Sequence, residues 1–240
     1  MDAKADPVSN VAGRLLILPG VGNTRFQFSR FAAHAARLLP GFAVEIRTWG
    51  QPLLTLRNLR AYTRNLAVAR DLAVELARWR HAHPTSKLYL LGYSGGGGVA
   101  ALVASGLAPE IAIDRLILVA PAISPDYPMA ESVLPHVTEF VASFASKRDI
   151  QVGWGTRTFG TIDRRFTASA GAVGFRSTSP KLLELHWSRD DLRYGHHGNH
   201  WSYLGRRWQA ARLLPALEPA TTAAGLRLRW SAGDSTGRPI

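Results

Sequence analysis

The sequence predicts a three-layer α/β domain, in which a mainly parallel sheet of about six strands carries helices on both faces. Three observations support this fold class. The chain has 240 residues, a length typical of one domain, and 46% of them are hydrophobic, enough for a sizeable core. Short apolar runs alternate with longer amphipathic stretches along the chain. In the first half of the chain the apolar runs are continuous rather than alternating, as strands buried on both faces require, while 137–144 alternates apolar residues.

Strands and helices can be assigned in order along the chain. Six apolar runs are expected to be the strands: Leu15–Leu18, Ala43–Thr48, Leu88–Leu91, Leu116–Ala120, Val137–Phe144 and Leu182–Trp187. Apolar residues at helical spacing predict helices over 28–38, 58–80, 99–107 and 203–217. Pro19-Gly20 ends the first strand, and Pro40-Gly41 stops the first helix.

The whole chain, 1–240, is expected to be a single domain with its core over about 14–217. The segment 153–180, between the last two strands, is rich in Gly, Ser, Thr and Arg. A connection of that length is uncommon inside a domain and is usually functional or mobile, so we expect an insertion near the site. The tail, 219–240, is expected to be a loosely held extension.

Composition and charge exclude several classes of protein. The chain contains no cysteine, which excludes disulfides, thiol catalysis and cysteine-ligated metal sites. Its 29 Lys and Arg against 17 Asp and Glu leave a formal net charge of +12. The arginines are scattered among apolar residues without a dense tract. We therefore expect an arginine-rich solvated surface and no nucleic-acid partner, while an acidic lipid or an acidic substrate stays open.

No targeting or membrane-spanning segment is expected. Met1–Asn10 carries Asp2 and Asp6 and lacks the apolar stretch of a secretory signal. The longest apolar runs are far shorter than the roughly 20 residues that cross a bilayer. We therefore expect a cytoplasmic protein without a membrane span.

The most informative motif is Gly92-Tyr93-Ser94-Gly95-Gly96, which lies directly after one predicted strand and before a helix. This is G-x-S-x-G in the strand–turn–helix context that the motif needs. A side chain at the apex of so sharp a turn strains the backbone, and flanking glycines remove the Cβ atoms that would clash. The pattern therefore favours Ser94 as a nucleophile over the alternative, a glycine-rich turn with an incidental serine.

With this motif in place, the chain resembles the α/β-hydrolases over about Arg14 to Leu217. The resemblance implies that the loop after the first strand, Leu18-Pro19-Gly20-Val21-Gly22, supplies one oxyanion-hole N–H. The hole would then consist of the backbone amides of Val21 and Gly95, with Gly22 as the alternative donor. The same loop is a poor nucleotide-binding fingerprint, because Arg25 occupies the place of its third glycine.

A serine hydroxyl needs a base, and the base needs an anion to orient it. The loop before the last helix contains His196, His197 and His200. It has the position in which α/β-hydrolases keep their catalytic histidine, and His200, followed by Trp201, best resembles the family's pattern. His197 is the alternative and His196 follows it. A metal site built on His197 and His200 lacks an evident third ligand besides Asp190 or Asp191, so no metal is expected.

Three aspartates are candidates for the orienting acid. Asp149 follows the fifth predicted strand across a short turn, which is the family's commonest acid position. Asp126, after the fourth strand, has a rarer position, and Asp163 lies in the insertion. Any of the three could instead only cap a turn.

The expected activity is that of a serine hydrolase, which cleaves an ester, thioester or amide bond through an acyl-enzyme on Ser94. His200 would move the proton and Asp149 would orient His200, with a small-molecule acyl substrate and no cofactor. Tyr93, beside the nucleophile, is expected to contact the substrate. The insertion's aromatic residues could line an acyl pocket or only anchor the insertion: Trp154, Phe159, Phe166 and Phe175. The alternatives are a non-catalytic protein of the same fold that binds a ligand or partner, and a polyanion-binding protein.

Overall fold

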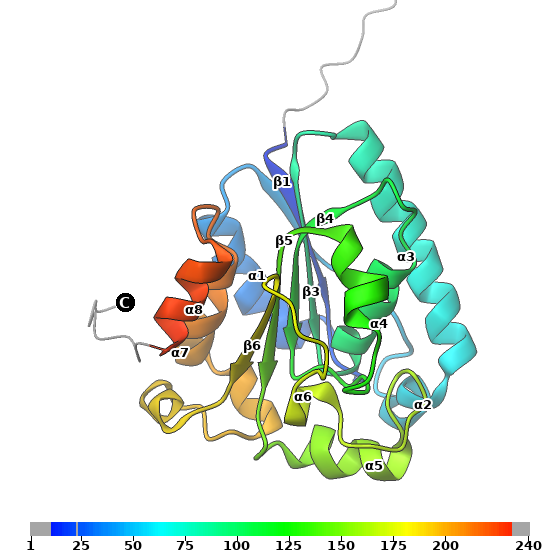
Figure 1. Ribbon diagram of the computed structural model, residues 1–240, viewed down its shortest axis with the longest axis vertical. Coiled ribbons are helices and arrows are strands. Elements are labelled where there is room, and N and C mark those ends of the chain that lie inside the picture. The colour runs from blue at the N-terminus through cyan, green and yellow to red at the C-terminus, as the bar shows by residue number, and fades with distance from the viewer. Residues whose placement is uncertain (1–10, 23, 232–240) are drawn as a thin grey trace, which may run out of the picture.

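Parallel strands form one sheet in the order β2-β1-β3-β4-β5-β6 in the computed structural model, which describes residues 11–22 and 24–231 (Figure 1). The strands are β1 (Gly13–Leu18), β2 (Phe42–Ile46), β3 (Lys87–Tyr93), β4 (Ile113–Val119), β5 (Val137–Ala145) and β6 (Leu182–His186). Every neighbouring pair is parallel. All six predicted strands and the predicted fold class are confirmed.

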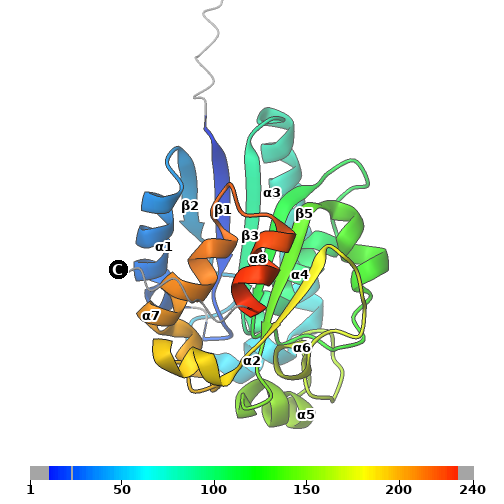
Figure 2. The same cartoon turned by 60° about the vertical axis from the view of Figure 1, so that its left-hand side comes forward.

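Helices cover both faces of the sheet (Figures 1 and 2). They are α1 (Phe26–Leu38), α2 (Thr55–Arg60), α3 (Tyr62–Ala82), α4 (Gly95–Ser105), α5 (Thr156–Phe159), α6 (Ala170–Val173), α7 (Arg206–Trp208) and α8 (Ala223–Ser231). Successive side chains of a strand point to opposite faces. Leu16 and Leu18 therefore join the core beneath α3 and α4, while Leu15 and Ile17 join the core beneath α1, α7 and α8.

The carboxyl ends of the strands meet at one edge of the sheet, where α2, α5 and α6 also lie (Figure 1). β1 has β2 on one side and β3 on the other. The chain leaves β1 toward α1 on one face and leaves β3 toward α4 on the opposite face. In open α/β sheets a crevice forms outside the strand ends at such a switch point, and ligands bind there.

Two predicted helices have different bounds in the structure. The stretch 58–80 forms two helices, because the backbone at Ala61 leaves helical geometry between α2 and α3 (φ −80°, ψ 59°). The buried Asn65 side chain donates to the carbonyl of Asn58 across this break, at 2.8 Å. The helix after the G-x-S-x-G motif has the four glycines 95–98 in its first turn and ends at Ser105 rather than at Leu107.

The predicted amphipathic helix over 203–217 is instead a series of short turns. These are η5 (His200–Leu204), α7, η6 (Gln209–Leu213) and η7 (Leu214–Ala216), of 3-10, α, π and 3-10 geometry respectively. Gly205 is extended (φ −65°, ψ 126°) and separates the first two turns. Pro215 lies in the last one and has no backbone N–H to continue a helix.

The insertion is anchored to the segment that follows β4. It contains the end of η3 (Gln151–Gly155), then α5 and α6. Ile162 N–H donates to the carbonyl of Ala122 at 2.9 Å, and Ala170 N–H donates to that of Ile123 at 2.8 Å. The insertion therefore packs beside the carboxyl edge of the sheet, close to the serine turn.

The tail is not loosely held over the residues that the structure describes. Leu226 of α8 is buried, and the Trp230 indole donates to the carbonyl of His186 at 3.1 Å. The apolar face of α8 completes the core on that side of the sheet, which the weak periodicity of 219–231 did not reveal. The rest of the tail, 232–240, and the segment Met1–Asn10 lie outside the described residues.

Candidate active site

Ser94 lies at the apex of the turn between β3 and α4, in a strained backbone conformation (φ 55°, ψ −122°). A Cβ on Gly96 would overlap the carbonyl oxygens of Leu18 and Pro19, and a Cβ on Gly92 would overlap the backbone of Gly96. Ser94 N–H donates to the carbonyl of Val119 at 2.8 Å. Packing and hydrogen bonds thus hold the strained turn and fix where the hydroxyl points.

Three side chains from distant parts of the chain meet at this turn. The Nε2 atom of His200 lies 2.8 Å from Ser94 Oγ, and its Nδ1 atom lies 2.6 Å from Asp149 Oδ2. All three residues are buried. Because the ionised carboxylate can only accept, Nδ1–H donates to Asp149 and Nε2 is left to accept from the serine hydroxyl. This arrangement can remove a proton from Ser94.

Asp149 is oriented by the turn of chain that follows it. Its second oxygen, Oδ1, accepts the backbone N–H groups of Gln151 and Val152, at 3.1 and 3.3 Å. These are the first amides of the η3 turn, whose free N–H groups favour a negative charge. One carboxylate oxygen is therefore held in place by backbone, while the other faces His200.

Tyr93 does more than contact the pocket. Its hydroxyl donates to the backbone carbonyl of His200 at 2.9 Å, and its ring stacks on the imidazole with 4.9 Å between centroids. Burial, with a smaller contribution from the Asp149 charge, raises the pKa of Tyr93 well above its usual value, so the hydroxyl remains a donor. The ring also lines the cavity beside Ser94. Tyr93 thus positions the histidine as well as facing the pocket.

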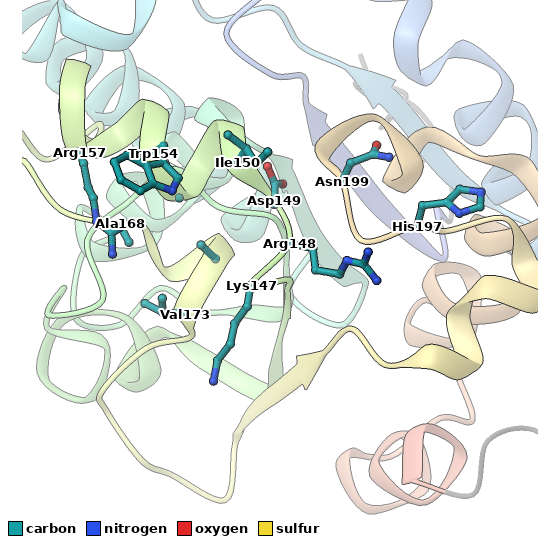
Figure 3. A pocket seen from close by; sticks show the side chains of 12 residues that line it. Lys147, Arg148, Asp149, Ile150, Trp154, Arg157, Ala168, Val173, His197 and Asn199 are labelled. Carbon is teal, nitrogen blue, oxygen red and sulfur yellow. The ribbon is translucent and has the colours of Figure 1, made fainter.

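The other histidines of the loop do not reach Ser94. His197 is exposed and lines a separate open cavity of about 650 Å³ behind Asp149 (Figure 3). His196 is fully buried against Tyr203 and Trp208, and its Nδ1 accepts the N–H of Gly198 at 3.0 Å. Burial lowers the pKa of His196 to about 4, so this ring is neutral. Its contacts brace the loop that carries His200.

The two alternative aspartates have other partners. Asp126 forms an exposed ion pair with Arg176 at 2.7 Å. Asp163 accepts the N–H and the hydroxyl of Ser124, at 3.0 and 2.5 Å, and the hydroxyl of Thr161 at 2.5 Å. Asp163 therefore ties the insertion to the loop after β4, and neither aspartate contacts His200.

Gly95, the residue after Ser94, lies against Val21 of the loop that follows β1. A Cβ on Gly95 would overlap Cγ1 of Val21. The backbone N–H groups of both residues have no acceptor among residues 11–22 and 24–231. Gly95 is the first residue of α4, so its N–H also lies at the positive end of that helix. These two amides can donate to an oxygen that develops negative charge beside Ser94.

Two residues that the sequence reasoning missed hold the Val21 loop in place. The Trp49 indole donates to the carbonyl of Pro19 at 2.7 Å, and Asn58 Nδ2 donates to that of Val21 at 2.8 Å. Asn58 is fully buried, as is Asn65 seven residues later. Two asparagines spaced by seven on the core-facing side of a predicted helix are the signal that could have pointed to this role.

A mostly apolar cavity of about 350 Å³ opens beside Ser94 and His200. Its apolar walls come from the Val21 loop, α2, η3, α5 and the residue after His200: Val21, Leu56, Leu59, Val152, Phe159 and Trp201. Of the insertion's aromatic residues, Phe159 lines this cavity, Trp154 lines the separate one, and Phe175 is buried in the core. Phe166 is exposed.

Neither a metal site nor a membrane-spanning helix is present among residues 11–22 and 24–231. No group of three or more His, Asp or Glu there could hold a metal ion. No helix within residues 11–22 and 24–231 is both long and apolar enough to pass through a bilayer.

Comparison with known proteins places the chain among hydrolases. Residues 12–186 match the family described as serine aminopeptidase, S33. Among solved structures, the dienelactone hydrolase-like promiscuous phosphotriesterase from metagenomic libraries is similar with a TM-score of 0.52 and 17% identity, covering 87% of each chain. The catalytic core domain of acetyl xylan esterase from Trichoderma reesei has a TM-score of 0.51 and 12% identity, covering 88% of this chain and 100% of that one. No curated protein sequence matches the chain.

Proposed function

The chain belongs to the serine aminopeptidase, S33 family of α/β-hydrolases, and from that premise we propose that it is a serine hydrolase that forms an acyl-enzyme on Ser94. The observation that carries the proposal is the unbroken chain of hydrogen bonds from Ser94 Oγ through His200 to Asp149, at 2.8 and 2.6 Å. It joins a hydroxyl, a base and an orienting anion, which is the arrangement that activates a serine.

The first half of the reaction forms the acyl-enzyme. Ser94 Oγ bonds to the substrate carbonyl carbon while His200 Nε2 takes the hydroxyl proton. The carbonyl oxygen becomes negatively charged and accepts hydrogen bonds from the Val21 and Gly95 amides, each worth about 2.7–4 kcal/mol in comparable sites. When the bond to the leaving group breaks, the leaving group takes the proton from His200. Asp149 stabilises the imidazolium throughout.

The second half regenerates the enzyme. A water molecule takes the place of the leaving group, and His200 Nε2 removes one of its protons as its oxygen bonds to the acyl carbon. The tetrahedral intermediate is held by the same two amides. Its collapse returns the proton to Ser94 Oγ and releases the carboxylic acid.

The cavity favours an ester of an apolar carboxylic acid. Its lining contains no Asp or Glu, and Asp149, the nearest carboxylate, already pairs with His200. An aminopeptidase needs an anion to hold the positively charged amino terminus of a peptide, and no lining residue supplies one. Leu56, Leu59 and Phe159 instead offer walls for an uncharged acyl chain.

A serine-directed fluorophosphonate tests the proposal directly. The folded protein should be labelled and should hydrolyse p-nitrophenyl esters, while Ser94→Ala should show neither property. His197→Ala is the matched control, because this neighbouring histidine is exposed and does not contact Ser94. Absence of labelling and turnover in the folded protein would favour the alternative, a non-catalytic protein that binds a ligand in the same cavity.

A further inference from the structure

Exposed apolar side chains gather around the mouth of the active-site cavity. Three come from the residues before α2 and from its first turn: Leu53, Leu54 and Leu56, of which Leu53 is 78% exposed. Leu56 also lines the cavity, so this segment lies at its mouth. Large apolar side chains rarely remain in water in such a group unless the surface binds something.

A second group of exposed apolar side chains lies in the segment after β5, where Ile150 and Trp154 line the neighbouring open cavity, and beside His200. Ile150 and Trp154 of the segment after β5 are 71% and 67% exposed, and Trp201, beside His200, is 57% exposed. Trp201 lines the cavity, and α5, which continues from Trp154, contacts α2 (Figure 1). We call these side chains the apolar rim: Leu53, Leu54, Leu56, Ile150, Trp154 and Trp201.

Cations flank the apolar rim without carboxylate partners. Arg57 and Arg60 lie on α2, and the Arg157 guanidinium lies over the Trp154 ring, 5.5 Å from its centroid (Figure 3). Lys147 and Arg148 precede Ile150 and line the same open cavity as Trp154 and Arg157 (Figure 3). None of these five cations forms an ion pair with any residue that the structure describes.

Acidic residues are missing from the same segments of the sequence. Residues 47–60 contain no Asp or Glu, and residues 147–160 contain only Asp149, which is buried and paired with His200. The positive charge around the rim is therefore uncompensated, in a chain with a net charge of +12. A negatively charged partner would be attracted to this face over about one Debye length.

We propose that the apolar rim and its cations bind the surface of an anionic lipid bilayer, with the cavity mouth facing the lipid. Leucine, isoleucine and tryptophan side chains can enter the layer between head groups and acyl chains, while Lys and Arg extend to the lipid phosphates. The rim comes from separate segments of the chain: the residues before and in α2, the segment after β5 and the residue after His200. An ester with an apolar chain could then pass from the bilayer into the cavity.

Binding can be tested apart from catalysis. The inference rests on the proposed function only for the source of the substrate, because adsorption does not use Ser94. Ser94→Ala protein should co-sediment with vesicles of equal parts phosphatidylcholine and phosphatidylglycerol as well as the unchanged protein does. It should remain in solution with phosphatidylcholine vesicles at the same lipid concentration, and added salt should weaken its binding.

Two pairs of substitutions separate the rim from the rest of the surface. Leu53→Ser/Ile150→Ser, which spares the cavity lining, should weaken binding at least about tenfold. The control Val74→Ser/Leu228→Ser removes aliphatic side chains that are 50% and 70% exposed on α3 and α8, and this variant should bind as before. Both double variants should keep their turnover of a soluble short-chain ester, which shows that they fold.

A second pair of double variants tests the contribution of the cations. Arg57→Gln/Arg157→Gln should weaken binding about tenfold, whereas Arg70→Gln/Arg78→Gln, on exposed positions of α3, should not. Absence of binding to the mixed vesicles, or equal losses in the control variants, would overturn the proposal. So would binding that poly-glutamate abolishes and that the Leu53→Ser/Ile150→Ser variant retains, because the partner would then be an acidic protein surface.

Discussion

At the amino ends of β3, β4 and β5 the charged side chains form one network, whereas the cations around the cavity mouth have no carboxylate partner among the described residues. Asp114 pairs with Arg80 at 2.8 Å and with Lys87 at 3.2 Å, and Glu139 pairs with Lys87 at 2.6 Å and with Arg115 at 2.5 Å. The charged side chains at the amino edge of the sheet thus pair with one another, whereas the cations at the carboxyl edge face solvent.

Backbone strain also distinguishes the two edges of the sheet. Among the described residues, the non-glycine residues with positive φ are Leu53, Ser94, Ala120 and Arg164. All four lie in segments at the carboxyl edge: the loop before α2, the serine turn, the end of β4 and the insertion. Strain of this kind persists only where surrounding structure enforces it. The ion pairs at the amino edge stabilise the folded chain, and this stability offsets the free-energy cost of the strained backbone at the carboxyl edge.

Removing the hydrogen bond between Asp149 and His200 should have the largest effect of these variants, and it should change activity but not stability. Asp149→Asn should lower kcat about 10⁴-fold, because an amide that donates to His200 favours the wrong imidazole tautomer. Asp126→Asn, which removes only an exposed carboxylate, should leave kcat unchanged. Steady-state kinetics on a p-nitrophenyl ester compares the two, and an equal loss in both variants would contradict the role proposed for Asp149.

Breaking the amino edge should instead reduce stability. The Arg115 guanidinium is buried and donates to the carbonyls of Ala216, Glu218, Pro219 and Thr221 as well as to Glu139. Arg115→Met leaves these acceptors unpaired and should lower the free energy of unfolding by about 3–5 kcal/mol.

Denaturant unfolding would measure that loss, with the exposed Arg176→Met as a matched control that should cost at most about 1 kcal/mol. At temperatures where Arg115→Met remains folded, its kcat should be unchanged. If Arg115→Met instead lowered kcat without lowering the free energy of unfolding, the amino edge would contribute to activity and not to stability.

Two carboxyls, the buried Asp114 and the partly buried Glu184, make the two regions differ in how stability depends on pH. Burial alone would raise the pKa of Asp114, but the Leu88 N–H, Arg80 and Lys87 outweigh it and lower that pKa. Glu184, on β6, lies 3.7 Å from the His186 ring, and no Lys or Arg among residues 11–22 and 24–231 forms an ion pair with it. Burial raises the pKa of Glu184 to about 7, against a smaller opposing effect of the Phe175 N–H.

The folded chain therefore holds a proton on Glu184 that the unfolded chain releases near pH 4.5. Stability from this group is complete below that pH and is lost as the pH rises toward 7, by about 3 kcal/mol. Glu184→Gln should flatten this part of the profile, so its advantage over the unchanged protein should grow between pH 5 and 8. Parallel unfolding profiles of the two proteins would contradict this expectation.

Local patterns predicted most of the architecture. Continuous apolar runs identified most of the strands, because strands buried on both faces are mainly apolar, and alternating apolar residues identified β5. Patterns failed where a distant contact decides the local geometry. The break at Ala61 depends on the buried Asn58 and Asn65, and the ordered helix α8 depends on the apolar groove that Leu226 fills.

By itself the sequence determined the serine turn, since only a G-x-S-x-G run between a strand and a helix tolerates both the strain and the close backbone contacts at Ser94. It narrowed the base to one loop and the acid to three aspartates. Only the tertiary structure decided that His200 and Asp149 lie beside Ser94, and that cations and apolar side chains from separate segments share one face. Proximity between residues more than 50 positions apart is set by how the strands and helices pack, which no local pattern encodes.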